Sequence, residues 1–110
     1  MIDRYPVITL CGSTKFKDEF IQAEKSLTLL GNIVLTCGLF NLADSEELSD
    51  SMKEMLDDMH KRKIDMSDGI YVINVNDYIG ESTKSEIIYA KAHGKRITYL
   101  FDHREADYDA

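Results

Sequence analysis

The chain has 110 residues, of which 44% are hydrophobic and 30% charged, so it has the size and composition of one globular domain with a single core. Its formal net charge of −7 disfavours nucleic acid and anionic membranes as partners, but a small anionic ligand can still be held by local cations and backbone amides. No apolar stretch is long enough to span a membrane, the first residues do not form a signal peptide, and the two cysteines lack C-x-x-C spacing, so we expect a cytoplasmic protein.

The first third of the chain predicts a strand, a helix and a second strand. The apolar run Val7–Cys11 predicts a strand that ends at Gly12, where a sharp turn or the close approach of a ligand is allowed. Ser13 or Thr14 can cap the helix that follows. The apolar residues of that helix recur at spacings of three and four: Phe16, Phe20, Ala23, Leu27 and Leu30. Ile33–Cys37 then predicts the second strand.

A second helix follows an irregular stretch at residues 39–49. The sequence Ser51-x-x-Glu54 has the spacing of a capping box, so we expect the helix to begin there and to run to about Ser67. Its expected buried face consists of four apolar residues: Met52, Met55, Leu56 and Met59.

The last part of the chain predicts a strand, a helix and a strand. Gly69–Val75 is an apolar run typical of a buried strand. The spacing Thr83-x-x-Glu86 is a further capping box. The apolar residues expected on the buried side of the helix are Ile87, Ile88, Ala90 and Ala92. Arg96–Phe101 predicts the fourth strand, and residues 102–110 are expected to form a loosely ordered acidic tail.

This alternation of strands and helices predicts an α/β fold. Connections of this length imply parallel strands with right-handed crossovers. We therefore expect residues 1–110 to form one three-layer, Rossmann- or flavodoxin-like sandwich, with about four parallel strands in the order 2-1-3-4. In that order the first and third strands diverge at their carboxyl ends and leave a crevice between them.

Two helix N-termini face this predicted crevice, and their amides and partial positive charges suit an anion such as phosphate. The candidate substrate- or phosphate-binding residues are Cys11, Gly12, Ser13, Thr14, Lys15, Gly80, Glu81, Ser82 and Thr83. Glu86 is the carboxylate among them, and Lys84 could add a positive charge. A purely structural role is also open, because Ser13 and Thr83 are typical caps and Glu86 completes a capping box.

Metal binding and ATP hydrolysis are not favoured by the sequence. Cys11 and Cys37 end neighbouring predicted strands, but they have no nearby histidine or further cysteine in the sequence, so we expect no metal. Gly12-Ser13-Thr14-Lys15 lacks the G-x-x-x-x-G-K-[ST] spacing of a P-loop.

Four segments give the chain a resemblance to a known family. They are Leu10-Cys11-Gly12-Ser13, Ser67-Asp68-Gly69, Ser85-Glu86-Ile87-Ile88-Tyr89-Ala90 and Gly94-Lys95-Arg96-Ile97. In order and spacing they resemble the nucleoside 2-deoxyribosyltransferase superfamily, which includes the 2′-deoxynucleoside 5′-monophosphate N-hydrolases. The similarity extends from about Val7 to Leu100.

The resemblance implies a covalent mechanism that needs no cofactor. Glu86 would attack C1′ of a deoxyribose as the base leaves, and water or a second base would resolve the glycosyl ester. A 5′-phosphate, if it is recognised, would be bound by residues of the two helix N-termini: Gly12, Ser13, Lys15, Ser82 and Thr83.

The chain departs from the family pattern near the expected general acid. His60 stands where the family usually has an aspartate, and Asp57 lies one helical turn earlier. Gly80 stands where relatives place a serine or aspartate, and the adjacent Glu81 is a possible replacement. The expected catalytic residues are therefore Glu86, His60 and Asp57.

The sequence leaves three functional hypotheses. The first is cleavage or transfer at the N-glycosidic bond of a 2′-deoxynucleoside or its 5′-monophosphate. The second is a nucleotide-binding or sensing module without activity, and the third is another phosphate-binding protein of the same architecture, such as a phosphoribohydrolase. In each case the partner is a small nucleoside or nucleotide, and we expect a homodimer or higher homo-oligomer because a small sheet leaves edges to cover.

Overall fold

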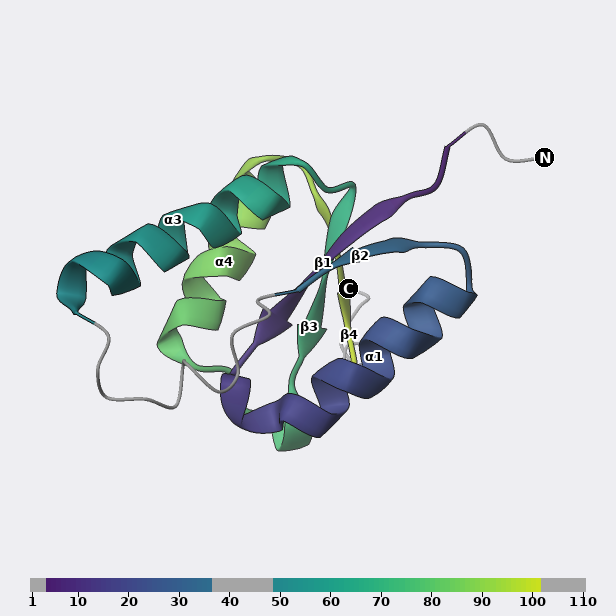
Figure 1. Ribbon diagram of the computed structural model, residues 1–110, viewed down its shortest axis with the longest axis horizontal. Helices are drawn as coiled ribbons and strands as arrows, with labels where there is room; N and C mark the ends of the chain where they lie inside the picture. The colour runs from purple at the N-terminus through teal and green to yellow at the C-terminus, as the bar shows by residue number, and fades with distance from the viewer. Residues whose placement is uncertain (1–3, 37–48, 102–110) are drawn as a thin grey trace, which may run out of the picture.

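The computed structural model describes residues 4–36 and 49–101 and has the predicted alternation of strands and helices (Figure 1). In chain order the strands and α-helices are β1 (Val7–Gly12), α1 (Lys17–Leu29), β2 (Ile33–Leu35), α3 (Asp50–Asp65), β3 (Gly69–Ile73), α4 (Glu81–Ala92) and β4 (Arg96–Tyr99). Short 3₁₀ turns, Thr14–Phe16 and Val75–Asp77, follow β1 and β3. Cys37 and the acidic tail lie outside the described residues.

The four strands form one parallel sheet in the order β2-β1-β3-β4, which confirms the predicted topology. Thr9 in the centre of β1 lies opposite Leu35 on one side and Ile70 on the other. Helices α3 and α4 cover one face of the sheet and α1 covers the other (Figure 1). The molecule is therefore a three-layer α/β sandwich of Rossmann-like type, as the sequence predicts.

Alternating residues of the strands build a core on each face of the sheet. The core toward α3 and α4 contains Cys11, Ile64, Ile70, Val72 and Ala90. The core toward α1 contains Leu10, Phe20, Ala23 and Ile73. The predicted apolar positions of α1 are correct at its centre, since Phe20 and Ala23 are both buried.

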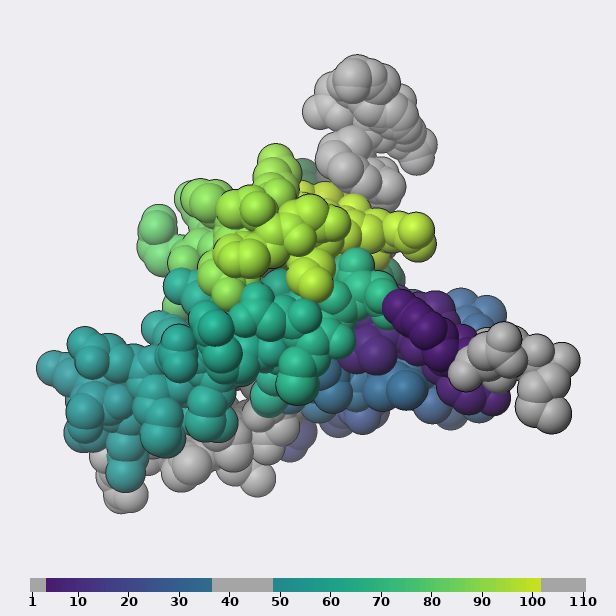
Figure 2. All heavy atoms as spheres, turned by 90° about the horizontal axis from the view of Figure 1, so that it is seen from above, coloured from purple at the N-terminus to yellow at the C-terminus, as the bar shows by residue number. Residues whose placement is uncertain are grey.

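The predicted start and buried face of α3 are wrong. The side chain of Ser49, not that of Ser51, caps the helix by accepting a hydrogen bond from the Met52 amide at 3.2 Å. The three methionines are half exposed: Met52 49%, Met55 52% and Met59 44%. His60 and Ile64 are buried instead, because the C-terminal half of α3 packs against the sheet and α4, whereas its N-terminal half extends beyond them (Figure 2).

The predicted capping box of α4 is also wrong. The helix begins at Glu81 after Gly80, so Thr83 and Glu86 are helical residues, and both are buried. Ile88 is 68% exposed and Ala92 is exposed, whereas Thr83, Glu86 and Ala90 form the buried face. The prediction is therefore correct for Ala90 and for Ile87, which packs against the core, and wrong for Ile88 and Ala92.

No helix within the described ranges is long and apolar enough to cross a membrane.

Candidate functional site

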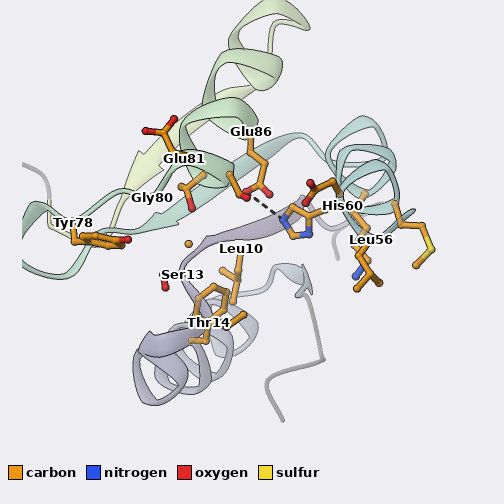
Figure 3. Close-up of a pocket in the computed structure, with 16 residues that line it drawn as sticks. Leu10, Ser13, Thr14, Leu56, His60, Tyr78, Gly80, Glu81 and Glu86 are labelled. Atoms are coloured by element: carbon orange, nitrogen blue, oxygen red, sulfur yellow. Dashed lines mark ion pairs between the residues drawn. The ribbon is translucent and has the colours of Figure 1, made fainter. Parts of the chain in front are cut away.

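A cavity of about 460 Å³ lies at the carboxyl ends of β1 and β3, where the sequence predicts a crevice (Figure 3). Its walls come from the turn after β1, from α3, and from the loop and first turns of α4. Ten of the predicted site residues line it: Gly12, Ser13, Thr14, Asp57, His60, Gly80, Glu81, Ser82, Thr83 and Glu86. Its volume is within the usual range for sites that bind small molecules.

Two predicted binding residues lie elsewhere. Cys11 is fully buried beneath the cavity, with its sulfur near His60 and Glu86. The Nζ atom of Lys15 lies 3.7 Å from the centre of the Tyr78 ring, a cation–π contact rather than a position in the cavity wall. Within the described ranges, neither residue lines the cavity.

Gly12 brings β1 into close contact with its neighbours at the floor of the cavity. A Cβ atom on Gly12 would lie 2.9 Å from the Ile73 Cβ and 3.3 Å from the Phe20 ring. A side chain at this position would therefore push β1 away from β3, and glycine is the residue that fits.

The two helical N-termini at the cavity differ in their capping. The Ser13 side chain accepts a hydrogen bond from the Lys15 amide at 3.3 Å. In the described part of the chain no side chain caps α4, whose first intrahelical bond runs from the Lys84 amide to the Gly80 carbonyl. The first-turn amides of α4, beside the cavity, are therefore suited to bind an anion.

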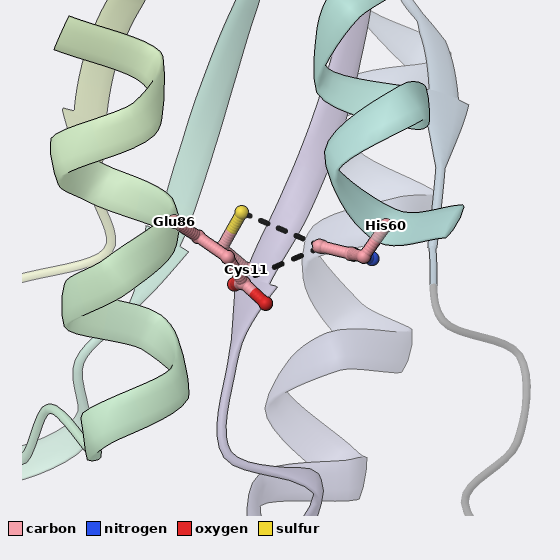
Figure 4. A group of neighbouring side chains, drawn as sticks. All are labelled: Cys11, His60 and Glu86. Atoms are coloured by element: carbon pink, nitrogen blue, oxygen red, sulfur yellow. Dashed lines mark hydrogen bonds and ion pairs between the residues drawn. The ribbon is translucent and has the colours of Figure 1, made fainter. Parts of the chain in front are cut away.

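Glu86, His60 and Cys11 approach one another at one side of the cavity (Figure 4). Glu86 comes from α4, His60 from α3 and Cys11 from β1. The distance from His60 Nε2 to Glu86 Oε1 is 3.8 Å, and that from His60 Nε2 to Cys11 Sγ is 3.5 Å. His60 and Glu86 are each 9% exposed, and Cys11 is not exposed at all.

Burial shifts the pKa values of all three groups toward their neutral forms. Desolvation raises the pKa of Glu86 to about 7; a hydrogen bond from Cys11 opposes the shift and the charge of Asp57 adds to it. Desolvation, followed by the charge of Lys63, lowers the pKa of His60 to about 4. Desolvation and Glu86 raise the pKa of the Cys11 thiol. His60 is therefore neutral at pH 7, and its contact with Glu86 is not an ion pair despite the geometry.

Asp57 and His60 lie one helical turn apart on α3, and both line the cavity. Their spacing of three residues places them on the same face of the helix without any shift or rotation of α3. The Asp57 side chain is exposed, so it can meet a ligand at the open part of the cavity. The three expected catalytic residues, Asp57, His60 and Glu86, therefore line the same cavity.

Sequence reasoning missed six residues of the cavity wall: Leu10, Phe20, Leu56, Met59, Lys63 and Tyr78. Lys63 is partly buried, and its Nζ donates a hydrogen bond to the Thr36 carbonyl oxygen at 2.7 Å. Tyr78 follows Asn76 and Asp77, which both have positive φ angles and reverse the chain after β3. The Asn-Asp pair before an aromatic residue is the sequence signal that could have indicated Tyr78.

No protein-family model matches the sequence, and a search of curated proteins finds no match. The function must therefore be argued from the chemistry of this cavity and from the resemblance of its motifs.

Proposed function

We propose that the protein is an enzyme that cleaves or transfers at the N-glycosidic bond of a 2′-deoxynucleoside or its 5′-monophosphate, with Glu86 as the nucleophile. The observation that carries this proposal is the position of Glu86. Its carboxyl group is buried at the wall of a cavity whose other walls include the Gly12-Ser13 turn and the N-terminus of α4. Carboxyl groups with perturbed pKa values in clefts are typical of functional sites.

The proposed reaction has two displacements. A Glu86 oxygen forms a bond to C1′, the bond from C1′ to the base nitrogen breaks, and its electron pair leaves with the base, which takes up a proton. Water or a second base then attacks C1′ and releases the glutamate. Ionised Glu86 is the reactive form, and the nearby Lys61 charge and the Cys11 hydrogen bond favour it.

The proton for the leaving base is assigned to Asp57. His60 is neutral at pH 7 and buried against Cys11, whereas Asp57 is exposed at the same cavity one turn away. A carboxylate at the open part of the cavity can pass a proton from solvent to the leaving base and accept a hydrogen bond from a base N–H. Asp57 therefore takes the role of the family aspartate.

The 5′-phosphate, where the substrate carries one, is assigned to the first turn of α4. The amides of Glu81, Ser82 and Thr83 lie at the uncapped N-terminus, and all three residues line the cavity. The expected cation Lys15 contacts Tyr78 instead, so backbone amides and hydroxyl groups carry this recognition.

A specific observation favours a second candidate, a nucleotide-binding module without activity. Burial makes His60 neutral and raises the pKa of Glu86 to about 7, so much of the cluster is uncharged at neutral pH. Such a cavity could bind a nucleoside without attacking it.

The deciding experiment measures release of free base by chromatography from a panel of deoxynucleosides and their 5′-monophosphates, with and without a second base. Wild type is compared with Glu86→Gln and with Glu24→Gln, an exposed glutamate of α1 that does not line the cavity. Release by wild type and Glu24→Gln but not by Glu86→Gln supports the proposal, and exchange onto the added base indicates a transferase. Ligand-induced thermal stabilisation without release of base from any substrate supports the binding module.

We also propose that the protein forms a homodimer or higher homo-oligomer. The half-exposed methionines of α3 are the apolar surface that supports this, since Met side chains adapt to protein contacts.

A further inference from the structure

Three types of metal ligand meet in the buried cluster formed by Cys11, His60 and Glu86. One sulfur, one imidazole nitrogen and one carboxylate oxygen all lie within 4.8 Å of one another (Figure 4). The sequence argued against a metal because it showed no histidine near a cysteine. The fold removes that argument, since it brings His60 to 3.5 Å from Cys11 across 49 residues of chain.

The distances are close to those of a tetrahedral zinc site. Zinc bonds of about 2.3 Å to sulfur and about 2.0–2.1 Å to nitrogen or oxygen place sulfur about 3.5 Å from nitrogen and nitrogen about 3.4 Å from oxygen. The Cys11 Sγ to His60 Nε2 distance is 3.5 Å, and the His60 Nε2 to Glu86 Oε1 distance is 3.8 Å. The second distance is about 0.4 Å longer than the zinc geometry gives.

The three side chains of the cluster share few protons for hydrogen bonds among themselves. Cys11 has a single S–H proton, which can be donated to His60 or to Glu86 but not to both. The 3.8 Å between His60 and Glu86 is too long for a hydrogen bond between them. A divalent cation bonded to all three atoms satisfies each of these buried groups at once.

Charge and surroundings also suit a zinc ion. A thiolate and a carboxylate neutralise its two positive charges, so the buried site carries no net charge. His60 hydrogen-bonds to the backbone of Leu10, the kind of outer contact that orients metal-binding histidines. His60 and Glu86 also line the cavity, which leaves room for a fourth ligand. Sulfur and imidazole ligands select zinc over magnesium or calcium.

We propose that Cys11, His60 and Glu86 form a binding site for one Zn²⁺ ion, and that zinc bound there blocks any reaction that requires a free Glu86 carboxylate. Binding displaces the thiol proton, and the carboxyl proton where present, into solvent. The metal site itself does not depend on the proposed glycosidic activity. Only its inhibitory consequence does.

The first test uses Co²⁺ as a spectroscopic substitute for zinc in the chelator-treated full chain. Wild type is expected to show a thiolate-to-cobalt charge-transfer band in the near ultraviolet, which added Zn²⁺ abolishes. Cys37→Ser, which removes the only other thiol of the sequence, should keep this band, and Cys11→Ser should lose it. Absence of the band in wild type, or its loss in Cys37→Ser alone, would overturn the proposal.

A second measurement protects the test against misfolding of the Cys11 variant. Zn²⁺ is expected to raise the melting temperature of wild type, and Glu86→Gln should bind Zn²⁺ at least about 100-fold more weakly by competition with a chromophoric chelator. Asp58→Asn, which changes an exposed carboxylate of α3 that does not line the cavity, should retain wild-type affinity. Equal zinc affinity in Glu86→Gln and wild type would contradict the assignment of Glu86. None of these measurements uses a nucleoside, so the zinc site can be confirmed or refuted independently of the proposed release of base.

Discussion

At the scale of single residues, two neighbouring aspartates of α3 have different surroundings. Asp57 lines the cavity and its charge acts on both His60 and Glu86. Asp58 is exposed and lies 3.7 Å from Arg62 in a pair on the same helix. Because such exposed pairs contribute little, Asp58 serves as a matched control for Asp57.

We expect Asp57→Asn to lower kcat for base release by about 100-fold or more, since a general acid contributes about 10²–10⁴-fold. The amide keeps the shape of the side chain but cannot deliver a proton. Asp58→Asn should leave kcat unchanged. Steady-state kinetics on the best substrate of the panel, with kcat and KM determined separately, checks this. An equal effect of both substitutions, or an effect on KM alone, would count against Asp57 as the acid.

The candidate site is harder to predict from the sequence than the fold. Residues that directly follow a strand, such as Gly12, Ser13 and Gly80, could be placed at the cavity because the carboxyl ends of parallel strands meet at one edge. The meeting of Cys11 with His60 could not be predicted. It depends on how far α3 extends along the sheet, which follows from packing and not from local pattern.

At the scale of elements, strands were easier to predict than the ends of helices. Apolar runs marked the two central strands most clearly, because β1 and β3 are largely buried and apolar on both faces. The start of α3 was misplaced because Ser49 and Ser51 can both act as caps, and only the path of the chain decides between them. The start of α4 was misplaced because, within the described residues, the helix begins after Gly80 with no side-chain cap. The buried face of α3 was misassigned because Met52 and Met55 belong to its N-terminal half, which extends beyond the sheet.

The cap of α3 provides a test at this scale. Ser49→Ala should lower the free energy of unfolding by about 1 kcal/mol, because the Met52 amide loses its acceptor. Ser51→Ala, at the position that the sequence favoured, should have a clearly smaller effect, since among the described residues its hydroxyl bonds to the Ser49 hydroxyl and caps no amide. Urea denaturation followed by circular dichroism measures both. A larger loss of stability in Ser51→Ala than in Ser49→Ala would instead support the capping box that begins at Ser51.

At the scale of the whole molecule, one surface carboxylate joins the beginnings of the two central strands. Asp68 accepts a hydrogen bond from the Val7 amide at 2.8 Å and pairs with Arg4. Its own amide donates to the Val7 carbonyl at 2.7 Å. Asp68 therefore fixes β1 against the start of β3, and the order of the sheet depends in part on this contact.

This contact predicts how the stability of the fold depends on pH. The Val7 amide, followed by Arg4, lowers the pKa of Asp68 in the folded protein below its usual value of 3.8, although some desolvation opposes the shift. The ionised carboxylate thus stabilises the fold above the unfolded pKa, and this contribution is lost as the pH falls through the lower folded value. As the pH falls from about 5 to about 2, Asp68→Asn should lose less stability than wild type, and thermal unfolding of both proteins measures this. Parallel curves would exclude a role for Asp68.

The half-exposed methionines of α3 form an apolar surface that a second copy of the chain could cover. Met52, Met55 and Met59 recur at spacings of three and four, so they share one face of the helix. We expect wild type to be a dimer or larger at micromolar concentration by light scattering, and Met55→Lys to shift it toward monomer, because a charge buried in an apolar interface is costly. Ile21→Lys, the same kind of change at a 48% exposed residue of α1, should leave the assembly intact. A monomeric wild type would refute the oligomer, and dissociation by Ile21→Lys alone would move the interface to α1.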